Sequence, residues 1–137
     1  MISQQKTLLG MTLDELRQVC KELGMPAFTG GQMAKWLYVH RVKEIDEMTD
    51  ISKANRARLS ESYTVGCHAP VDAQHSADGT IKYLFPVAGG KFVETVYLPE
   101  NDRATLCVSC QVGCKMNCLF CQTGKQGVEG SLDACDI

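Results

Sequence analysis

Residues 107–121 read Cys107-Val-Ser-Cys110-Gln-Val-Gly-Cys114-Lys-Met-Asn-Cys118-Leu-Phe-Cys121, and no other stretch constrains this chain as strongly. The run holds five of the eight cysteines within fifteen residues. Thiols at this density are either oxidised to disulfides or bound to a soft metal, because thiolates select iron–sulfur clusters, zinc or copper. The choice between these states decides most of what the sequence says about function.

Composition and targeting signals help to decide whether the cysteines bind metal or form disulfides. The chain has 137 residues, of which 45% are hydrophobic and 22% are charged, as expected of one ordinary domain or two very small ones. Its formal net charge of −2 does not by itself indicate a nucleic-acid binder. The sequence has neither a signal-peptide pattern nor an apolar run of membrane-spanning length. We expect a cytoplasmic monomer without membrane contact, in which clustered cysteines bind metal or react rather than form structural disulfides.

The first part of the chain predicts short helices. Thr12-Leu-Asp-Glu15 is a capping box, and the helix that it begins ends at Gly24. Thr29 is read as the start of a second helix, and a third is expected over 51–62. Together, residues 1–63 form a predicted helical accessory domain whose core includes Leu13, Leu16, Leu23, Met33, Trp36 and Leu37.

The spacing of the apolar residues changes from a helical to an alternating pattern after residue 63. Runs at 71–76, 80–87 and 91–98, separated by Gly-containing turns, predict an antiparallel β-rich linker over 64–103. Residues 104–108 predict a further strand, followed by the cysteine run as a loop. A glycine-containing loop and a short helix beginning after Ser131 are expected beyond it. That helix would be too short to be stable alone, so we expect the chain to be the N-terminal piece of a longer protein.

Spacing alone leaves several ligand sets open. Cys114-x3-Cys118-x2-Cys121 would hold three irons of a four-iron cluster and leave the fourth iron open to a ligand. Zinc would use the pairs Cys107-x2-Cys110 and Cys118-x2-Cys121, although the seven residues between the pairs are fewer than zinc ribbons use. A closed ferredoxin cluster with Cys110 as the fourth ligand is a third possibility. The spacing favours the open cluster over the other two.

Cys114-x3-Cys118-x-Phe120-Cys121 resembles the motif of radical S-adenosylmethionine enzymes, including the aromatic residue before the last cysteine. The surrounding sequence is similar to the RlmN/Cfr-type adenine methyltransferases of ribosomal RNA. The stretches that carry this similarity are Glu94-Thr-Val-Tyr-Leu-Pro99, Arg103-Ala-Thr-Leu-Cys107-Val-Ser and Gln111-Val-Gly-Cys114. Three helical stretches resemble the family's accessory domain: Leu23-Gly-Met-Pro-Ala-Phe-Thr-Gly30, Lys35-Trp-Leu-Tyr38 and Glu47-Met-Thr-Asp-Ile-Ser52.

The resemblance implies a role for each matching residue. Cys114, Cys118 and Cys121 would ligate a [4Fe-4S] cluster that binds S-adenosylmethionine, and Phe120 would contact this cofactor. In the family, a methylated cysteine near the C-terminus carries the methyl group to adenine C2. Cys107 matches the cysteine that helps to resolve the resulting protein–RNA adduct. Glu94 matches the glutamate that takes the C2 proton.

The resemblance also implies partners. The expected substrate is large-subunit ribosomal RNA, with transfer RNA as a second substrate, and a flavodoxin or ferredoxin would donate electrons. The helical domain would assist RNA binding, through phosphate contacts from cations among Lys35, Arg41, Lys43, Lys53, Arg56 and Arg58. On the same helical face as Met33 and Leu37, Trp36 is interpreted as a core residue rather than a base-stacking one.

The implied fold is α+β: the helical accessory domain, the antiparallel linker, and, over 104–137, the first strand and cluster loop of a truncated radical S-adenosylmethionine (β/α) barrel. We therefore expect this chain alone to be unable to methylate RNA. Cys110 departs from the serine of the family pattern, which keeps an alternative open. In that alternative, the chain is a zinc- or iron–sulfur-binding nucleic-acid module without catalysis.

Overall fold

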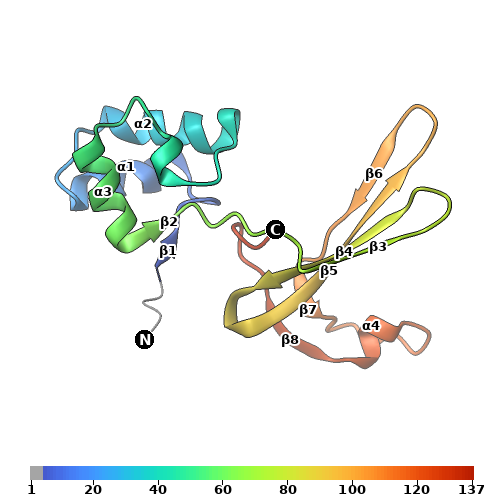
Figure 1. Ribbon diagram of the computed structural model, residues 1–137. Coiled ribbons are helices and arrows are strands. Elements are labelled where there is room, and N and C mark those ends of the chain that lie inside the picture. The colour runs from blue at the N-terminus through green and yellow to red at the C-terminus, as the bar shows by residue number, and fades with distance from the viewer. Residues whose placement is uncertain (1–4) are drawn as a thin grey trace. The chain divides into compact units, whose positions relative to one another are not determined.

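The computed structural model describes residues 5–137, and the chain divides after Cys67 into two compact units (Figure 1). Three of the four α-helices lie in the first unit, and six of the eight strands lie in the second. This distribution agrees with the predicted mixture of a helical part and a β-rich part. No helix within residues 5–137 combines the length and the apolar character that crossing a bilayer requires.

Helix α1 (Leu13–Glu22) begins at the predicted capping box. The Thr12 backbone N–H donates to Glu15 Oε2 over 2.6 Å, and the Glu15 N–H donates to Thr12 Oγ1 over 3.4 Å. The helix buries Leu16, Val19 and Cys20. Leu13 is 40% exposed, which corrects its prediction as a core residue. The next helix approaches α1 closely at Arg17, one turn beyond Leu13.

Helix α2 (Phe28–Lys35) starts before the predicted residue, because Thr29 is buried within its first turn. The turn is set by Pro26, whose carbonyl oxygen accepts from the Thr29 N–H over 3.0 Å. Gly30 faces α1 so closely that a Cβ there would lie 2.9 Å from Arg17 Cγ and 3.0 Å from Arg17 N. The helix therefore needs glycine at this crossing. It continues as a π-helical turn over Trp36–His40.

The remainder of the first unit closes its core. A 3-10 turn (Ile45–Glu47) leads to helix α3 (Lys53–Ser62), whose N-cap Ser52 accepts from the Asn55 N–H over 3.3 Å. Strand β1 (Lys6–Thr7) pairs in parallel with β2 (Tyr63–Thr64) and ties the two ends of the unit together.

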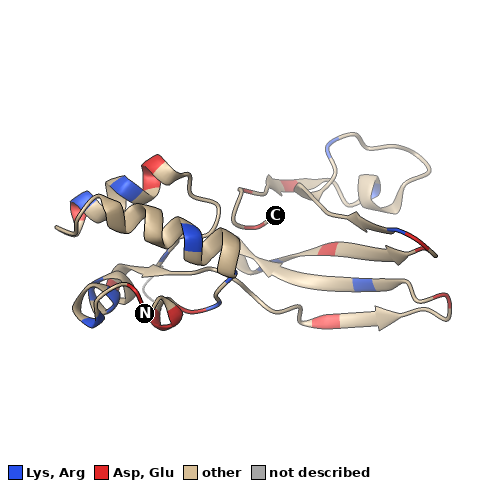
Figure 2. Ribbon diagram, turned by 90° about the horizontal axis from the view of Figure 1, so that it is seen from above, with Lys and Arg blue, Asp and Glu red and all other residues tan. Residues whose placement is uncertain are grey.

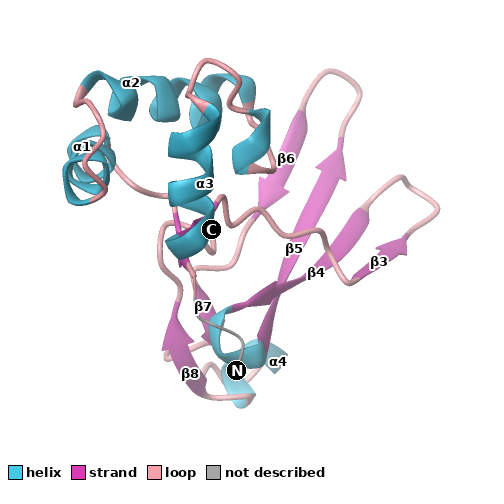
Figure 3. Cartoon of the chain, turned by 60° about the vertical axis from the view of Figure 1, so that its left-hand side comes forward, coloured by secondary structure: helices cyan, strands magenta, loops and turns pink. Residues whose placement is uncertain are grey.

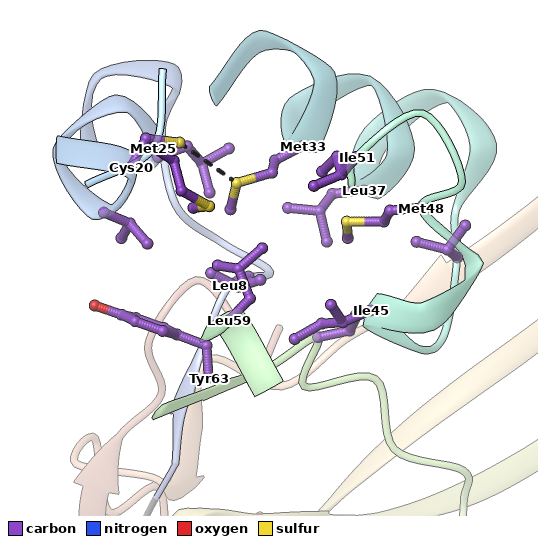
Figure 4. Packing of buried hydrophobic residues seen from close by; sticks show 14 residues of the cluster. Leu8, Cys20, Met25, Met33, Leu37, Ile45, Met48, Ile51, Leu59 and Tyr63 are labelled. Atoms are coloured by element: carbon purple, nitrogen blue, oxygen red, sulfur yellow. Dashed lines mark hydrogen bonds between the residues drawn. The ribbon is translucent and has the colours of Figure 1, made fainter. Parts of the chain in front are cut away.

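Fourteen buried residues form one apolar cluster in this unit (Figure 4). Its members are Leu8, Leu16, Val19, Cys20, Met25, Met33, Leu37, Val42, Ile45, Met48, Ile51, Leu59, Tyr63 and Val65. Leu23 and Trp36, both predicted core residues, are partly buried against it. The Cys20 thiol lies 3.7 Å from Met33 Sδ, and burial raises its pKa, as expected of an inert core thiol.

The second unit contains a four-stranded antiparallel sheet in the order β3-β4-β5-β6. Its strands are β3 (Asp72–His75), β4 (Ile81–Val87), β5 (Lys91–Pro99) and β6 (Ala104–Cys107). Strands β3, β4 and β5 lie where the predicted meander placed them, and β6 lies at the further strand predicted over 104–108. Strand β6 pairs antiparallel with β5. Its role as the first strand of a barrel stays a prediction.

A second antiparallel pair is formed by β7 (Gln111–Gly113) and β8 (Val128–Ser131) (Figure 3). The short helix α4 (Gln122–Lys125) lies between these two strands in the chain. Two predictions were wrong here. The cysteine run contains β7 rather than loop alone, and Ser131 ends a strand instead of capping a helix. The Leu132 N–H donates to the Cys110 carbonyl oxygen over 2.9 Å, which continues the pairing and keeps this backbone out of a helix.

Candidate functional site

The cysteine loop, residues 114–127, leaves β7 and returns to β8 within the second unit. It closes at its base, where the Cys114 N–H donates to the Gly127 carbonyl oxygen over 2.9 Å. A second hydrogen bond, from the Cys121 N–H to the Cys118 carbonyl oxygen over 3.2 Å, folds the middle of the loop. The three cysteines of the predicted ligand set thus belong to one closed loop.

Gly113 makes this closure possible. Its φ of +77° lies in the left-handed region, and a Cβ at this position would collide with the Gly127 carbonyl oxygen. That oxygen is the acceptor of the Cys114 amide. Any side chain at residue 113 would therefore displace the base of the cysteine loop.

The thiols of the loop are partly buried, and two of them contact backbone amides. Cys114, Cys118 and Cys121 are each partly buried, whereas Cys107 and Cys110 are exposed. The Met116 N–H lies 3.5 Å from Cys114 Sγ. Backbone N–H groups of Gly124 and then Thr123, in α4, lower the pKa of the Cys121 thiol. Amides directed at sulfur favour the thiolate, which is the form that binds metal.

The chemistry of the thiol donors and their arrangement in space lead to different conclusions about a cluster. Three partly buried thiols on one loop, two of them with amide donors, suit an iron–sulfur cluster chemically. However, no three His, Cys, Asp or Glu side chains within residues 5–137 are gathered closely enough to hold a metal ion. The ligand set Cys114, Cys118 and Cys121 stays a prediction, as does the zinc alternative with Cys107 and Cys110.

The tip of the cysteine loop is apolar and uncovered in this unit. Met116 is 78% exposed, Leu119 90% and Phe120 93%. Side chains of this size are rarely left in water without a partner that covers them. Phe120 is exposed next to Cys121. Its contact with a cofactor stays a prediction.

The sheet brings the two other predicted site residues onto one face. Val96 of β5 lies opposite Cys107 of β6, and Glu94 lies two residues before Val96. Side chains alternate between the faces of a strand, and directly opposed residues share a face. Glu94 and Cys107 therefore project from the same face of the sheet, in adjacent rows of side chains. They come from neighbouring strands (Figure 1).

Glu94 has a partner that sequence reasoning missed. Lys82 of β4 places its Nζ 3.0 Å from Glu94 Oε1, with the two side chains 41% and 56% exposed. Ser109 Oγ donates to the Glu94 carbonyl oxygen over 2.7 Å. The only sequence signal for Lys82 is its place in a strand with alternating residues. Its pairing depends on the register of the hairpin, which places Lys82 opposite Val96.

A hollow of about 550 Å³ lies between the start of β5 and the β7–β8 pair. Its lining includes Lys91, Phe92, Val112 and Glu129. Lys91 Nζ donates to the Glu129 carbonyl oxygen over 2.6 Å and lies 3.8 Å from its carboxylate. None of the predicted site residues lines this hollow.

Comparison with known proteins shows which family these features belong to. Residues 6–65 match the family described as "Ribosomal RNA large subunit methyltransferase N-terminal domain". Over 130 residues, 95% of this chain, the sequence is 58% identical to a probable dual-specificity RNA methyltransferase RlmN of Porphyromonas gingivalis W83. It is 59% identical over the same length to the protein of that name from Bacteroides fragilis. The chain belongs to the RlmN-type family.

A solved structure agrees with this assignment. The crystal structure of a radical SAM methyltransferase from Sphaerobacter thermophilus matches 93% of this chain, with a TM-score of 0.82 and 38% sequence identity. The match covers 38% of that protein, and this chain spans the same share of the Porphyromonas RlmN. This RlmN-type chain thus spans under half the length of these relatives.

The first unit of this RlmN-type chain coincides with the matched family domain, since its elements run from β1 to β2. Basic and acidic residues share its helices (Figure 2). Lys35, Arg41, Lys43 and Lys53 are exposed. Arg56 instead donates to the Asp46 carbonyl oxygen and is partly buried. The edge of Trp36 is occupied by a hydrogen bond from Nε1 to Asp50, which supports a packing role over base stacking.

Proposed function

We propose that the protein containing this chain is a radical S-adenosylmethionine methyltransferase that methylates C2 of adenine in large-subunit ribosomal RNA, and in transfer RNA. The observation that carries the proposal is the closed cysteine loop. In a chain of the RlmN-type family, Cys114, Cys118 and Cys121 follow β7 on one loop, with backbone amides beside the sulfurs of Cys114 and Cys121. That spacing is the family's cluster motif.

Cys114, Cys118 and Cys121 would hold the cluster. A [4Fe-4S] cluster held by three thiolates supplies an open iron for S-adenosylmethionine and the electron that cleaves it. The amides of Gly124 and Thr123 stabilise the Cys121 thiolate for this role. Phe120 would cover the cofactor with an apolar surface. We further propose that the enzyme is a cytoplasmic monomer that receives electrons from a flavodoxin or ferredoxin.

Glu94 and Cys107 would act on the RNA. The Glu94 carboxylate would accept the proton from adenine C2, and the electron pair of that C–H bond would stay with the ring. The Cys107 thiol lies on the same face and would act on the protein–RNA adduct after this proton is removed. A positioned base of this kind contributes about 10²–10⁴-fold to a reaction rate.

Activity requires more than these 137 residues. The chain spans 38% of its Porphyromonas relative. We propose that the chain alone does not methylate RNA. Formation of C2-methyladenosine by the isolated chain, supplied with cluster, cofactor and reductant, would contradict this.

The test of the proposed function uses the full-length enzyme, prepared without oxygen and reconstituted with iron and sulfide. Incubation with ribosomal RNA fragments, S-adenosylmethionine and reductant should yield C2-methyladenosine, detected by mass spectrometry of nucleosides. Cys118→Ala should abolish the product, whereas Cys135→Ala, outside the motif, should retain it. A wild-type enzyme with full cluster content and no product would refute the proposal.

One observation favours a second candidate. Cys110 adds a Cys-x2-Cys pair with Cys107, as a zinc-binding nucleic-acid module without catalysis would require. Metal analysis separates the two. Iron and sulfide in equal amounts, unchanged in Cys110→Ser, support the cluster. Stoichiometric zinc that is lost in Cys107→Ala supports the module.

A further inference from the structure

We propose that Lys82 is a positioning residue for the reaction, holding the Glu94 carboxylate in one orientation on the sheet face that also carries Cys107. This inference rests on the proposed function, because it requires Glu94 and Cys107 to act on the same RNA adenine. It goes further in assigning the role to a third residue, on a third strand. The structure supports it through register, contact and exposure.

Register places Lys82 in one row with Cys107. Lys82 lies opposite Val96 on one side, and Cys107 lies opposite Val96 on the other. The row therefore crosses β4, β5 and β6, and its side chains share a face. Glu94 belongs to the next row on this face, opposite Leu84.

The ion pair links the two rows. Opposed residues in a sheet have Cβ atoms about 5 Å apart, whereas diagonal ones are about 7–8 Å apart, within reach of long side chains. Lys82 Nζ reaches Glu94 Oε1 at 3.0 Å across this diagonal. The contact draws the carboxylate toward β4, on the sheet face that Cys107 of β6 shares.

The backbone beneath the carboxylate is held as well. Ser109 Oγ donates to the Glu94 carbonyl oxygen over 2.7 Å, from the segment that follows β6. Lys82 of β4 and Ser109, in the segment after β6, thus both contact Glu94. Within residues 5–137, the ion pair that the structure shows for Glu94 is with Lys82.

The fold does not require this pair. Both side chains are about half exposed, and exposed ion pairs contribute little to the stability of a protein. Removing the Lys82 charge should leave the sheet intact. An effect on catalysis can then be separated from an effect on folding.

Positioning explains what the pair does. A base must lie within hydrogen-bond reach of the proton that it removes, and a small displacement lowers the rate strongly. Without Lys82, the Glu94 side chain would rotate freely on an exposed sheet face. The carboxylate would then be directed toward adenine C2 for only part of the time.

The first experiment tests the contact in the 137-residue chain by NMR of the Glu94 side-chain carboxyl carbon at pH 7. Lys82→Met should move this signal, and Lys82→Arg should restore most of the shift. The matched control is Lys91→Met, which removes a lysine paired with Glu129 in the same unit and should leave the Glu94 signal in place. A Glu94 signal identical in wild type and Lys82→Met overturns the proposal.

The second experiment tests the role in the full-length enzyme. Lys82→Met should lower kcat for C2-methyladenosine formation by about tenfold or more while KM for RNA is unchanged. Lys82→Arg should recover most of kcat, and Lys91→Met should behave as wild type. Equal cluster content and equal melting temperatures exclude a folding defect.

The outcomes separate the two claims. An active wild type with an unchanged kcat in Lys82→Met overturns the role of Lys82 and leaves the proposed function standing. A raised KM with an unchanged kcat also overturns it, because Lys82 would then bind RNA. A wild-type enzyme that forms no C2-methyladenosine refutes the proposed function, and the role of Lys82 falls with it.

Discussion

Cys20 and Cys121 show how local structure sets the chemistry of a thiol. Cys20 lies in the core of the first unit, where burial raises its pKa. Cys121 accepts from the amides of Gly124 and Thr123, which lower its pKa. The thiolate is the reactive form, so the two residues should differ sharply in reactivity near neutral pH.

Alkylation measures this difference. In the metal-free, reduced chain, iodoacetamide should modify Cys121 with a pH midpoint below that of an ordinary thiol, about 8.5. Cys20 should be modified only when the chain unfolds. Peptide mass spectrometry over a pH series gives the midpoint for each cysteine. A Cys121 midpoint at or above the ordinary value would contradict the amide contacts.

The capping box of α1 gives a second prediction at this scale. Replacing Thr12 with Ala should lower the free energy of unfolding by about 1 kcal/mol, because the helix loses its N-cap. The Thr12 backbone N–H and then its hydroxyl lower the pKa of Glu15. The stability that depends on this contact is therefore present above the unfolded pKa of Glu15 and is lost as pH falls through the folded pKa.

Urea denaturation at several pH values tests this sign. The gap in unfolding free energy between wild type and Thr12→Ala should be widest at neutral pH and should narrow in acid, below the unfolded pKa of Glu15. Ser76→Ala, in a turn of the second unit, is a control without a helix cap. A gap that widens in acid would contradict the capping-box contact.

Residue-level prediction from the sequence worked where the partners are close in the chain. The capping box joins residues three apart, and the spacing alone identifies it. Lys82 was missed because its partner is twelve residues away across a hairpin. Its contact depends on a register that the sequence does not specify directly.

At the scale of elements, two neighbouring glycines in α2 give a matched pair. A Cβ at Gly30 would lie 2.9–3.1 Å from atoms of Arg17, whereas a Cβ at Gly31 would meet nothing within 4 Å. Gly30→Ala should destabilise the first unit by about 1–3 kcal/mol through overpacking. Gly31→Ala should stabilise it by about 0.4–1 kcal/mol, since alanine loses less backbone entropy in a helix.

Thermal denaturation of the two variants tests the α1–α2 crossing. The melting temperature should fall for Gly30→Ala and rise or stay unchanged for Gly31→Ala. Equal effects of the two substitutions would show that the helices do not approach each other at Arg17.

A similar comparison of two glycines tests the base of the cysteine loop. Gly113 and Gly89 both have a φ of +77°, but a Cβ at Gly113 would collide with Gly127, whereas one at Gly89 would meet nothing within 4 Å. Alanine at either position costs about 1–2 kcal/mol for the left-handed backbone. Only Gly113→Ala should also open the loop.

Amide hydrogen exchange measures that opening. The Cys114 N–H, bonded to the Gly127 carbonyl oxygen, should exchange at least tenfold faster in Gly113→Ala than in Gly89→Ala. Cluster reconstitution of the full-length enzyme should fall in the same order. Equal exchange rates in the two variants would contradict the proposed closure of the loop.

Element types were predicted more successfully than element ends. The strands at 72–75, 81–87 and 91–99 follow from alternation and glycine turns. Helix α2 begins before the residue predicted, because Pro26 starts the turn and Thr29 is buried. The segment after Ser131 was misread as a helix, since its pairing with the backbone of Cys110 joins residues far apart in the chain.

At the scale of the whole molecule, the buried apolar cluster belongs to the first unit, and the predicted site residues belong to the second. The cysteine motif and the stretches around it indicated the family from the sequence, because the members of each stretch are close in the chain. The ligand set that the motif implies stays a prediction. The shared face of Glu94 and Cys107 follows only from the pairing of β5 with β6. Resemblance supplied these two residues, and the register shows how they are brought together.

The central claim is that Cys114, Cys118 and Cys121 hold a cluster with one iron open to S-adenosylmethionine. Electron paramagnetic resonance of the reduced, reconstituted full-length enzyme tests it most directly. We predict a cluster signal that changes shape when S-adenosylmethionine is added and is absent in Cys118→Ala. A signal that does not respond to the cofactor, or stoichiometric zinc and no signal, would contradict the account.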